Sequence, residues 1–129
     1  MASFTSSLSS DSDAIAVFVN EKYDYRDKNG VLSKNTIQKI NSFLSNAKSK
    51  KKDDEITSFD ISDKQKCFIV KVKSKYENFF PEEIGGRFFS YLKKTKDLNK
   101  IDFYVDSLIF DKNKFIGFFA EFCLGFNLN

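Results

Sequence analysis

The side chains that most often perform catalysis or bind metal ions are scarce in this chain. It has 16 Phe but no His among its 129 residues. Histidine is the side chain that titrates near neutral pH and is the commonest metal ligand. The two cysteines, Cys67 and Cys123, lie far apart in the sequence, whereas zinc sites use closely spaced pairs. We therefore predict no catalytic, cofactor-binding or metal-binding residue in this chain.

Two carboxylate clusters are the remaining candidates for acid–base or metal chemistry. Asp53–Glu55 follows a run of lysines, which is typical of a solvated loop. Glu82 and Glu83 follow Pro81, a pattern that indicates the start of a helix, where carboxylates favour the positive end of the dipole. Catalytic carboxylates usually need a shielded pocket. Both clusters are therefore interpreted as structural.

Two serine–lysine pairs have the spacing of a known class of serine enzymes. Ser45 precedes Lys48 by three positions, and Ser90 precedes Lys93 in the same way. Both pairs fall on segments predicted to be lysine-rich helices, and the companion motifs of that enzyme class are missing. The spacing is interpreted as coincidence, so no nucleophile is assigned.

Only one pair of adjacent glycines, Gly85 and Gly86, could approach a phosphate closely. Phosphate cradles place their glycines in a turn between a strand and a helix, whereas this pair falls after the helix start at Pro81. Close packing of a helix on a sheet is the simpler explanation. A nucleotide or ADP-ribose site is not predicted.

Lysine supplies almost all of the positive charge, which exceeds the negative charge by only three. Four lysines lie within Lys48–Lys52, and Lys71, Lys73 and Lys75 alternate along a predicted strand. On a shared face these lysines could bind a nucleic-acid backbone. Lysines on an edge strand also protect a sheet against aggregation. The protective role is the favoured interpretation, and the binding role stays open as an alternative.

Four apolar segments are predicted to form strands and three to form helices. The predicted strands are Ala14–Asn20, Glu55–Ile61, Cys67–Val72 and Ile101–Val105, and Phe4 and Leu8 could anchor a further short edge strand in the Ser-rich start of the chain. The predicted helices begin after a cap at Ser33 or Asn35, at Pro81 and at Phe115. Turns are predicted at Asn29–Gly30 and Ser62–Gln65.

This order predicts an α/β domain with a mixed, mostly parallel sheet flanked by helices on both faces. Residues 1–129 are expected to form a single domain, in which residues 1–12 are an edge strand or flexible. The N-terminus lacks the features of a signal peptide, and no apolar run approaches the ~20 residues needed to span a membrane. We therefore predict a cytoplasmic protein in which Cys67 and Cys123 are buried, reduced thiols.

The last predicted helix, Phe115–Phe126, is apolar around its whole axis, with Glu121 as the main polar exception. Such a helix must be covered on every side, and one sheet covers only one side. Another segment, another subunit or a continuation of the chain must cover the rest. We therefore expect this chain to be a fragment of a longer, two-domain protein.

In order and spacing, these segments resemble the N-terminal domain of the leucine (cytosol) aminopeptidase family along essentially the whole chain. The resemblance is carried by AIAVFVN at 14–20, EEIGGRFFSYLKK at 82–94, IDFYVDSLI at 101–109 and AEFCLG at 120–125. The chain departs from the family pattern at Val72–Lys75, where members often have a glycine-containing turn. It departs again after Phe126, where members tend to continue with aromatic and basic residues.

The resemblance implies a macro-domain-like fold and a non-catalytic role in the assembly of an oligomer. Members of the family are metallopeptidases that bind a pair of divalent metal ions, zinc or manganese, and release N-terminal amino acids from peptides. Their metal ligands and catalytic side chains lie in a separate C-terminal domain, which this chain lacks. The implied partners are that domain and like subunits in a hexamer, and some bacterial members also bind DNA. The alternatives are a basic nucleic-acid-binding module and a free-standing protein-interaction domain.

Overall fold

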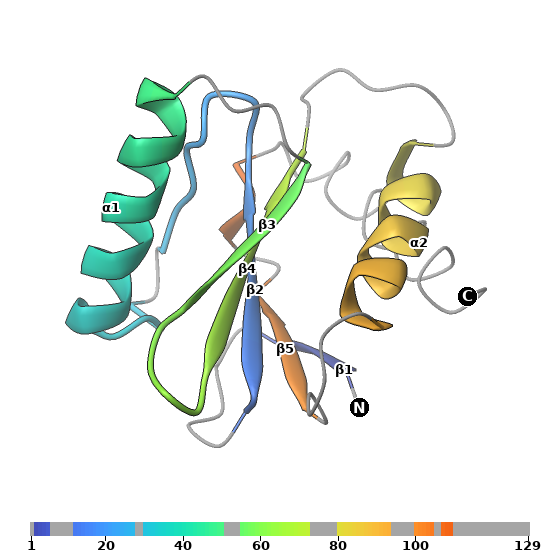
Figure 1. Cartoon of the computed structure of the whole chain (residues 1–129), viewed down its shortest axis with the longest axis horizontal. Coiled ribbons are helices and arrows are strands. Elements are labelled where there is room, and N and C mark those ends of the chain that lie inside the picture. The colour runs from blue at the N-terminus through green and yellow to red at the C-terminus, as the bar shows by residue number, and fades with distance from the viewer. Residues whose placement is uncertain are drawn as a thin grey trace. The chain divides into compact units, whose positions relative to one another are not determined.

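The computed structural model describes residues 2–5, 12–27, 30–50, 55–72, 80–93, 100–104 and 107–109 (Figure 1). The chain divides into two compact units. The first unit, Met1–Val72 with Asn99–Ile109, holds β1 (Ala2–Thr5), β2 (Ala14–Val19), α1 (Lys34–Ser49), β3 (Ile56–Asp60), β4 (Lys66–Lys71) and β5 (Ile101–Tyr104). The second unit, Lys73–Leu98 with Phe110–Asn129, holds α2 (Phe80–Lys93).

The sheet of the first unit has the strand order β1-β5-β2-β4-β3. The pairs β1–β5, β5–β2 and β2–β4 are parallel, and β3 pairs with β4 in the antiparallel direction. The predicted α/β class with a mixed, mostly parallel sheet is therefore confirmed. β1 lies at one end of this order, as predicted for the segment around Phe4, while Leu8 lies outside the described residues.

The central strand β2 is buried on both faces, as its continuous apolar sequence predicts. All six of its residues are buried. Ile15, Val17 and Val19 belong to the core that includes α1, and alternate side chains along a strand point to opposite faces of the sheet. Phe18 therefore lies on the other face, where its ring is 6.4 Å from that of Phe103 between centroids. Both faces of the sheet are covered at this strand.

Helix α1 lies along one face of the sheet (Figure 1). Its N-cap is Ser33, whose Oγ accepts a hydrogen bond from the backbone N–H of Thr36 at 3.2 Å. The buried residues Ile40, Leu44 and Ala47 recur at helical spacing and belong to the same core as the odd-numbered residues of β2. The predicted cap and apolar stripe are both confirmed, with Ser33 rather than Asn35 as the cap.

The segment between β2 and α1 is anchored to the end of β5 through Asp27. The carboxylate of Asp27 accepts hydrogen bonds from the backbone N–H groups of Val31 at 2.8 Å and Leu32 at 3.0 Å. It also accepts a hydrogen bond from the hydroxyl of Tyr104. Gly30 has φ +60 within this turn, a conformation that favours glycine. The turn predicted at this glycine is confirmed, and Asn29 lies outside the described residues.

Strand β5 is buried along its whole described length. The alternation of Ile101 and Phe103 with a polar residue correctly predicts a strand. It does not predict that the intervening Asp102 is only 2% exposed. The register pairs Asp102 with Ile15 of the central strand, so both side chains lie on the face that α1 covers.

Removal of the Ser107 hydroxyl is expected to destabilise the sheet. Ser107 Oγ accepts a hydrogen bond from the backbone N–H of Phe18 at 2.9 Å and donates one to the carbonyl of Tyr104. Because all three residues are fully buried, Ser107→Ala leaves an N–H without its acceptor and should cost about 1–3 kcal/mol in the free energy of unfolding. Urea unfolding measures the loss. Ser62→Ala, at an exposed turn, is the control and should change the stability by less than about 0.5 kcal/mol.

Helix α2 of the second unit begins at Phe80 and includes the predicted start at Pro81. Its Gly85 is buried, and Arg87 pairs with Glu83 at 3.1 Å one turn earlier. The prediction that helices flank both faces of the sheet stays a prediction, because α2 belongs to the other unit. The third predicted helix, Phe115–Phe126, lies outside the described residues. No described helix combines the length and the apolar composition needed to cross a membrane.

Candidate functional site

The candidate chemical groups do not form a reactive cluster in the described part of the chain. Within that part, no three His, Cys, Asp or Glu side chains lie close enough together to hold a metal ion. Glu55 precedes β3, and its carbonyl accepts a hydrogen bond from the Lys71 N–H at 2.8 Å. Asp53 and Asp54 lie outside the described residues. Glu83 is exposed on α2; for Glu82 no side-chain position is described.

Cys67 lies in β4 and is a fully buried free thiol, as predicted. Burial raises the pKa of this thiol well above its ordinary value, so the thiolate that would act as a nucleophile is strongly disfavoured. Cys123 lies outside the described residues.

The first serine–lysine pair lies beside a hollow of about 260 Å³ between α1 and the turn after β2. The lining residues are Tyr23, Asp24, Tyr25, Asn41, Leu44, Ser45 and Lys48. Lys48 Nζ lies 3.5 Å from a carboxylate oxygen of Asp24, and the Tyr25 hydroxyl donates a hydrogen bond to Asn41 Oδ1 at 3.0 Å. The partner that the structure gives Lys48 is thus a half-exposed surface carboxylate, and the geometry does not support a serine–lysine catalytic pair at Ser45.

The second serine–lysine pair lies on α2. Ser90 is exposed there, and the side chain of Lys93 lies outside the described residues.

Lys71 does not belong to an edge strand, so the protective role predicted for it is wrong. β4 lies between β2 and β3, and Lys71 at its carboxyl end is only 8% exposed. Its Nζ lies 4.6 Å from the centroid of the Tyr23 ring, a distance typical of a cation–π contact. Burial also removes Lys71 from an exposed lysine face that could bind nucleic acid. Lys73 and Lys75 lie outside the described residues.

Truncation of Lys71 is expected to lower stability. Lys71→Ala removes the cation–π contact and the buried aliphatic stem, and should cost about 1–2 kcal/mol in the free energy of unfolding. Lys48→Ala is the matched control: its ion pair with Asp24 is half-exposed, and such pairs contribute about 0–1 kcal/mol. Equal, small losses in urea unfolding for the two variants would contradict the buried contact.

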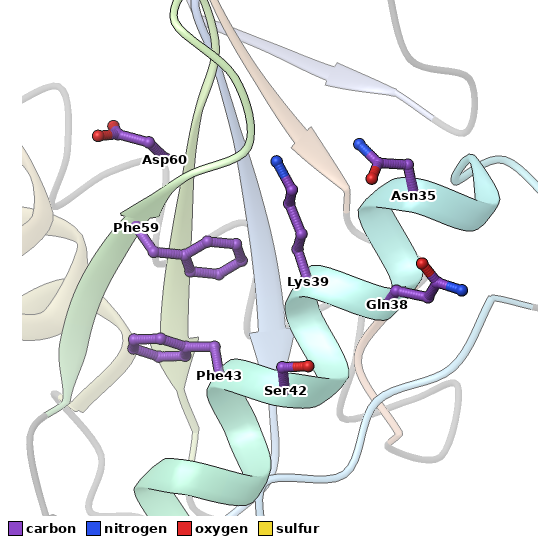
Figure 2. A pocket seen from close by; sticks show the side chains of 7 residues that line it. All are labelled: Asn35, Gln38, Lys39, Ser42, Phe43, Phe59 and Asp60. Atoms are coloured by element: carbon purple, nitrogen blue, oxygen red, sulfur yellow. The ribbon is translucent and has the colours of Figure 1, made fainter.

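A second hollow among the described residues of the first unit, larger than the one beside Lys48, is a groove of about 500 Å³ between α1 and β3, called here the α1–β3 groove. Its lining residues are Asn35, Gln38, Lys39, Ser42 and Phe43 of α1, with Phe59 and Asp60 of β3. The rings of Phe43 and Phe59 stack at 4.8 Å between centroids with an interplanar angle of 23°. Figure 2 shows the two rings lying against each other between the helix and the strand, with Lys39 on the same side of the helix.

Both phenylalanines are only partly buried, so the floor of the groove presents aromatic surface to solvent. At one end, Lys39 Nζ donates a hydrogen bond to the carbonyl of Ile61. Asp60 pairs with Lys66 at 3.1 Å. An open groove of this kind can hold an apolar side chain by burying its surface, but it does not bring reactive groups together.

Sequence reasoning missed both Phe43 and Phe59. The signal for Phe43 is weak: it lies next to the buried Leu44 on α1 and at the edge of the apolar stripe. Side chains alternate between the two faces of β3, and those of Thr57 and Phe59 lie on the same face as those of their register partners Ile69 and Cys67. Neither position predicts that the two rings meet.

No protein-family model matches the sequence, and neither the curated proteins nor the solved structures contain a match. The relation to the leucine aminopeptidase family therefore stays a prediction that depends on the sequence resemblance.

Proposed function

We propose that this chain is a non-catalytic α/β domain that acts by association with other proteins, in the manner of the N-terminal domain of a leucyl aminopeptidase. The observation that carries the association role is the α1–β3 groove, where the stacked rings of Phe43 and Phe59 are partly exposed. Aromatic side chains that remain accessible at a hollow are typical of surfaces that contact partners.

The segments that carry the resemblance support an aminopeptidase as the parent, the longer protein of which this chain would be the N-terminal domain. AIAVFVN supplies β2, EEIGGRFF lies within α2 and IDFY forms β5. The described strands and helices follow one another in the order that the resemblance implies. The proposed parent is a cytoplasmic aminopeptidase with a macro-domain-like N-terminal domain. Its pair of zinc or manganese ions would be held by the C-terminal domain, and its assembly would be a hexamer.

Three observations test this proposal. The gene region that follows Asn129 should encode a domain with metal ligands, and a fusion of the two domains should form a larger assembly than the catalytic domain alone. Sedimentation of the two proteins measures that difference. Hydrolysis of a leucine amide by this chain alone, in the presence of manganese or zinc, would contradict the non-catalytic role.

A further inference from the structure

The strand beside the α1–β3 groove lies at the end of the sheet order and pairs only with β4 among the described strands. The carbonyl of Glu55 accepts from the Lys71 N–H, and the Ile61 N–H donates to the carbonyl of Gln65. Antiparallel partners alternate between hydrogen-bonded and non-hydrogen-bonded pairs. Odd-numbered residues of β3 therefore bond to β4, and alternate residues, Ile56 and Asp60 among them, direct their backbone groups away from it.

The backbone groups of β3 that point away from β4 lie beside the α1–β3 groove. Phe59 is on the face of β3 that α1 covers, because its register partner Cys67 belongs to the core beneath that helix. An extended segment that added to β3 would direct alternate side chains toward the same face, where Phe43 and Phe59 offer an aromatic floor. Strand addition with alternate side chains in pockets is a common mode of peptide recognition.

The helix wall of the groove carries positive charge only. α1 has the sequence KNTIQKINSFLSNAKS, which contains no Asp or Glu. Lys39 donates to the neutral carbonyl of Ile61, and no described carboxylate is paired with it. Asn35 places one end of the groove at the first turn of α1, where the helix dipole adds positive potential. On the strand side, the negative charge of Asp60 is balanced by Lys66 at 3.1 Å.

We propose that the α1–β3 groove binds an extended acidic segment of a partner protein, which adds to the sheet alongside β3. An apolar side chain of that segment packs on Phe43 and Phe59, and a carboxylate two residues away on the same face lies near Lys39. A second copy of this chain fits less well, because it would bring another α1 with the same positive charge against the groove. The inference rests on the association role proposed above and is independent of the aminopeptidase parent.

The test uses the full chain labelled with nitrogen-15 and a fluorescein-labelled peptide of sequence TETFTET. The peptide places phenylalanine and two glutamates on one face of a strand, because side chains alternate with a period of two. Two comparison peptides are TKTFTKT, which reverses the charge, and TEPFPET, whose prolines cannot donate to a neighbouring strand. Fluorescence polarisation gives the affinities, and amide shifts locate the contact.

The expected result is binding of TETFTET with amide shifts centred on Ile56–Asp60 and Phe43, and binding of TKTFTKT and TEPFPET that is at least about tenfold weaker. Ser42→Glu adds a negative charge to the lining of the groove and should weaken TETFTET about tenfold, whereas Ser42→Lys should strengthen it. Ser45→Glu makes the same change on the same helix beside the other hollow, and should alter affinity by less than about twofold. Ser42 and Ser45 are both exposed, so these variants should fold.

Equal affinity for the acidic and lysine peptides, or shifts centred elsewhere, would overturn the inference. The inference would also be overturned if the chain self-associated with shifts of the β3 amide signals while none of the peptides bound. A second copy of the chain would then occupy the groove. If the chain binds none of the peptides but its fusion to the catalytic domain still forms a larger assembly than that domain alone, only the present inference is overturned. If the fusion also fails to form a larger assembly, the association role is removed as well.

Discussion

Asp27→Ala is expected to lower the free energy of unfolding by about 2–4 kcal/mol, because it removes the acceptor of three hydrogen bonds at once. Two of the donors are the backbone N–H groups of Val31 and Leu32, which lead into α1, and the third is the hydroxyl of Tyr104. Tyr104 is fully buried, so its hydroxyl has little access to water as a replacement acceptor. Urea unfolding at neutral pH measures the loss.

The Asp27 contribution should also depend on pH in a defined direction. Burial alone would raise the pKa of Asp27, but the hydrogen bonds from Tyr104, Leu32 and Val31 outweigh it and lower the pKa below its ordinary value of 3.8. A carboxyl group whose pKa is lowered by folding contributes its full stabilisation at pH values above its pKa in the unfolded chain. This stabilisation is lost as the pH falls through the lower pKa of the folded state.

The control for this pH dependence is Asp27→Asn, which keeps the shape of the side chain but cannot ionise. The stability difference between the natural chain and this variant should be largest at neutral pH and should shrink as the pH falls below 3.8. A difference that stays constant over this range would show that the charge of Asp27 does not contribute.

The parts of the fold that the sequence predicts well depend on local patterns. The continuous apolar run of β2, the cap at Ser33 and the spacing of Ile40, Leu44 and Ala47 can each be recognised within a few residues. The Asp27–Tyr104 hydrogen bond joins residues 77 positions apart. It depends on the return of the chain from β4 to the far side of β2, which no local pattern specifies.

The same reason explains the error on Lys71. The sequence marks its segment as a strand with alternating lysines, a pattern that edge strands often show. The position of β4 between β2 and β3 is a property of the strand order. Tyr23, whose ring contacts Lys71, lies in the connection after β2 and not near Lys71 in the sequence. Tyr23 has φ 64, which is uncommon for an aromatic residue. Composition alone cannot predict that such a turn would bring its ring beneath a lysine.

The α1–β3 groove also could not be predicted from the sequence, because it forms where α1 and the edge strand β3, which come from different parts of the chain, approach each other. Phe43 and Phe59 are two of 16 phenylalanines, and most side chains of this type serve as core. What distinguishes them is their partial exposure and their mutual stacking. The distinction has a measurable consequence, since a phenylalanine in the core and one in the groove should respond differently to truncation.

Phe68→Ala is expected to cost about 3–5 kcal/mol in the free energy of unfolding, the range for a phenylalanine truncated in a close-packed core. Phe68 lies in the middle of β4 and is fully buried. For a chain of this size the loss corresponds to a fall of roughly 10–20 °C in Tm. Phe59→Ala, on the neighbouring strand, removes a half-buried ring and one stacking contact and should cost only about 1–2 kcal/mol.

Thermal unfolding and the binding of TETFTET together separate the two roles. Phe59→Ala should retain a dispersed amide spectrum and lose most of its affinity for the peptide, because one of the two rings that form the aromatic floor of the groove is gone. Phe68→Leu keeps much of the buried volume and should retain both fold and binding, since it leaves the groove intact. If Phe59→Ala destabilised the chain as much as Phe68→Ala, its ring would be part of the core. The groove would then not be a surface open to a partner.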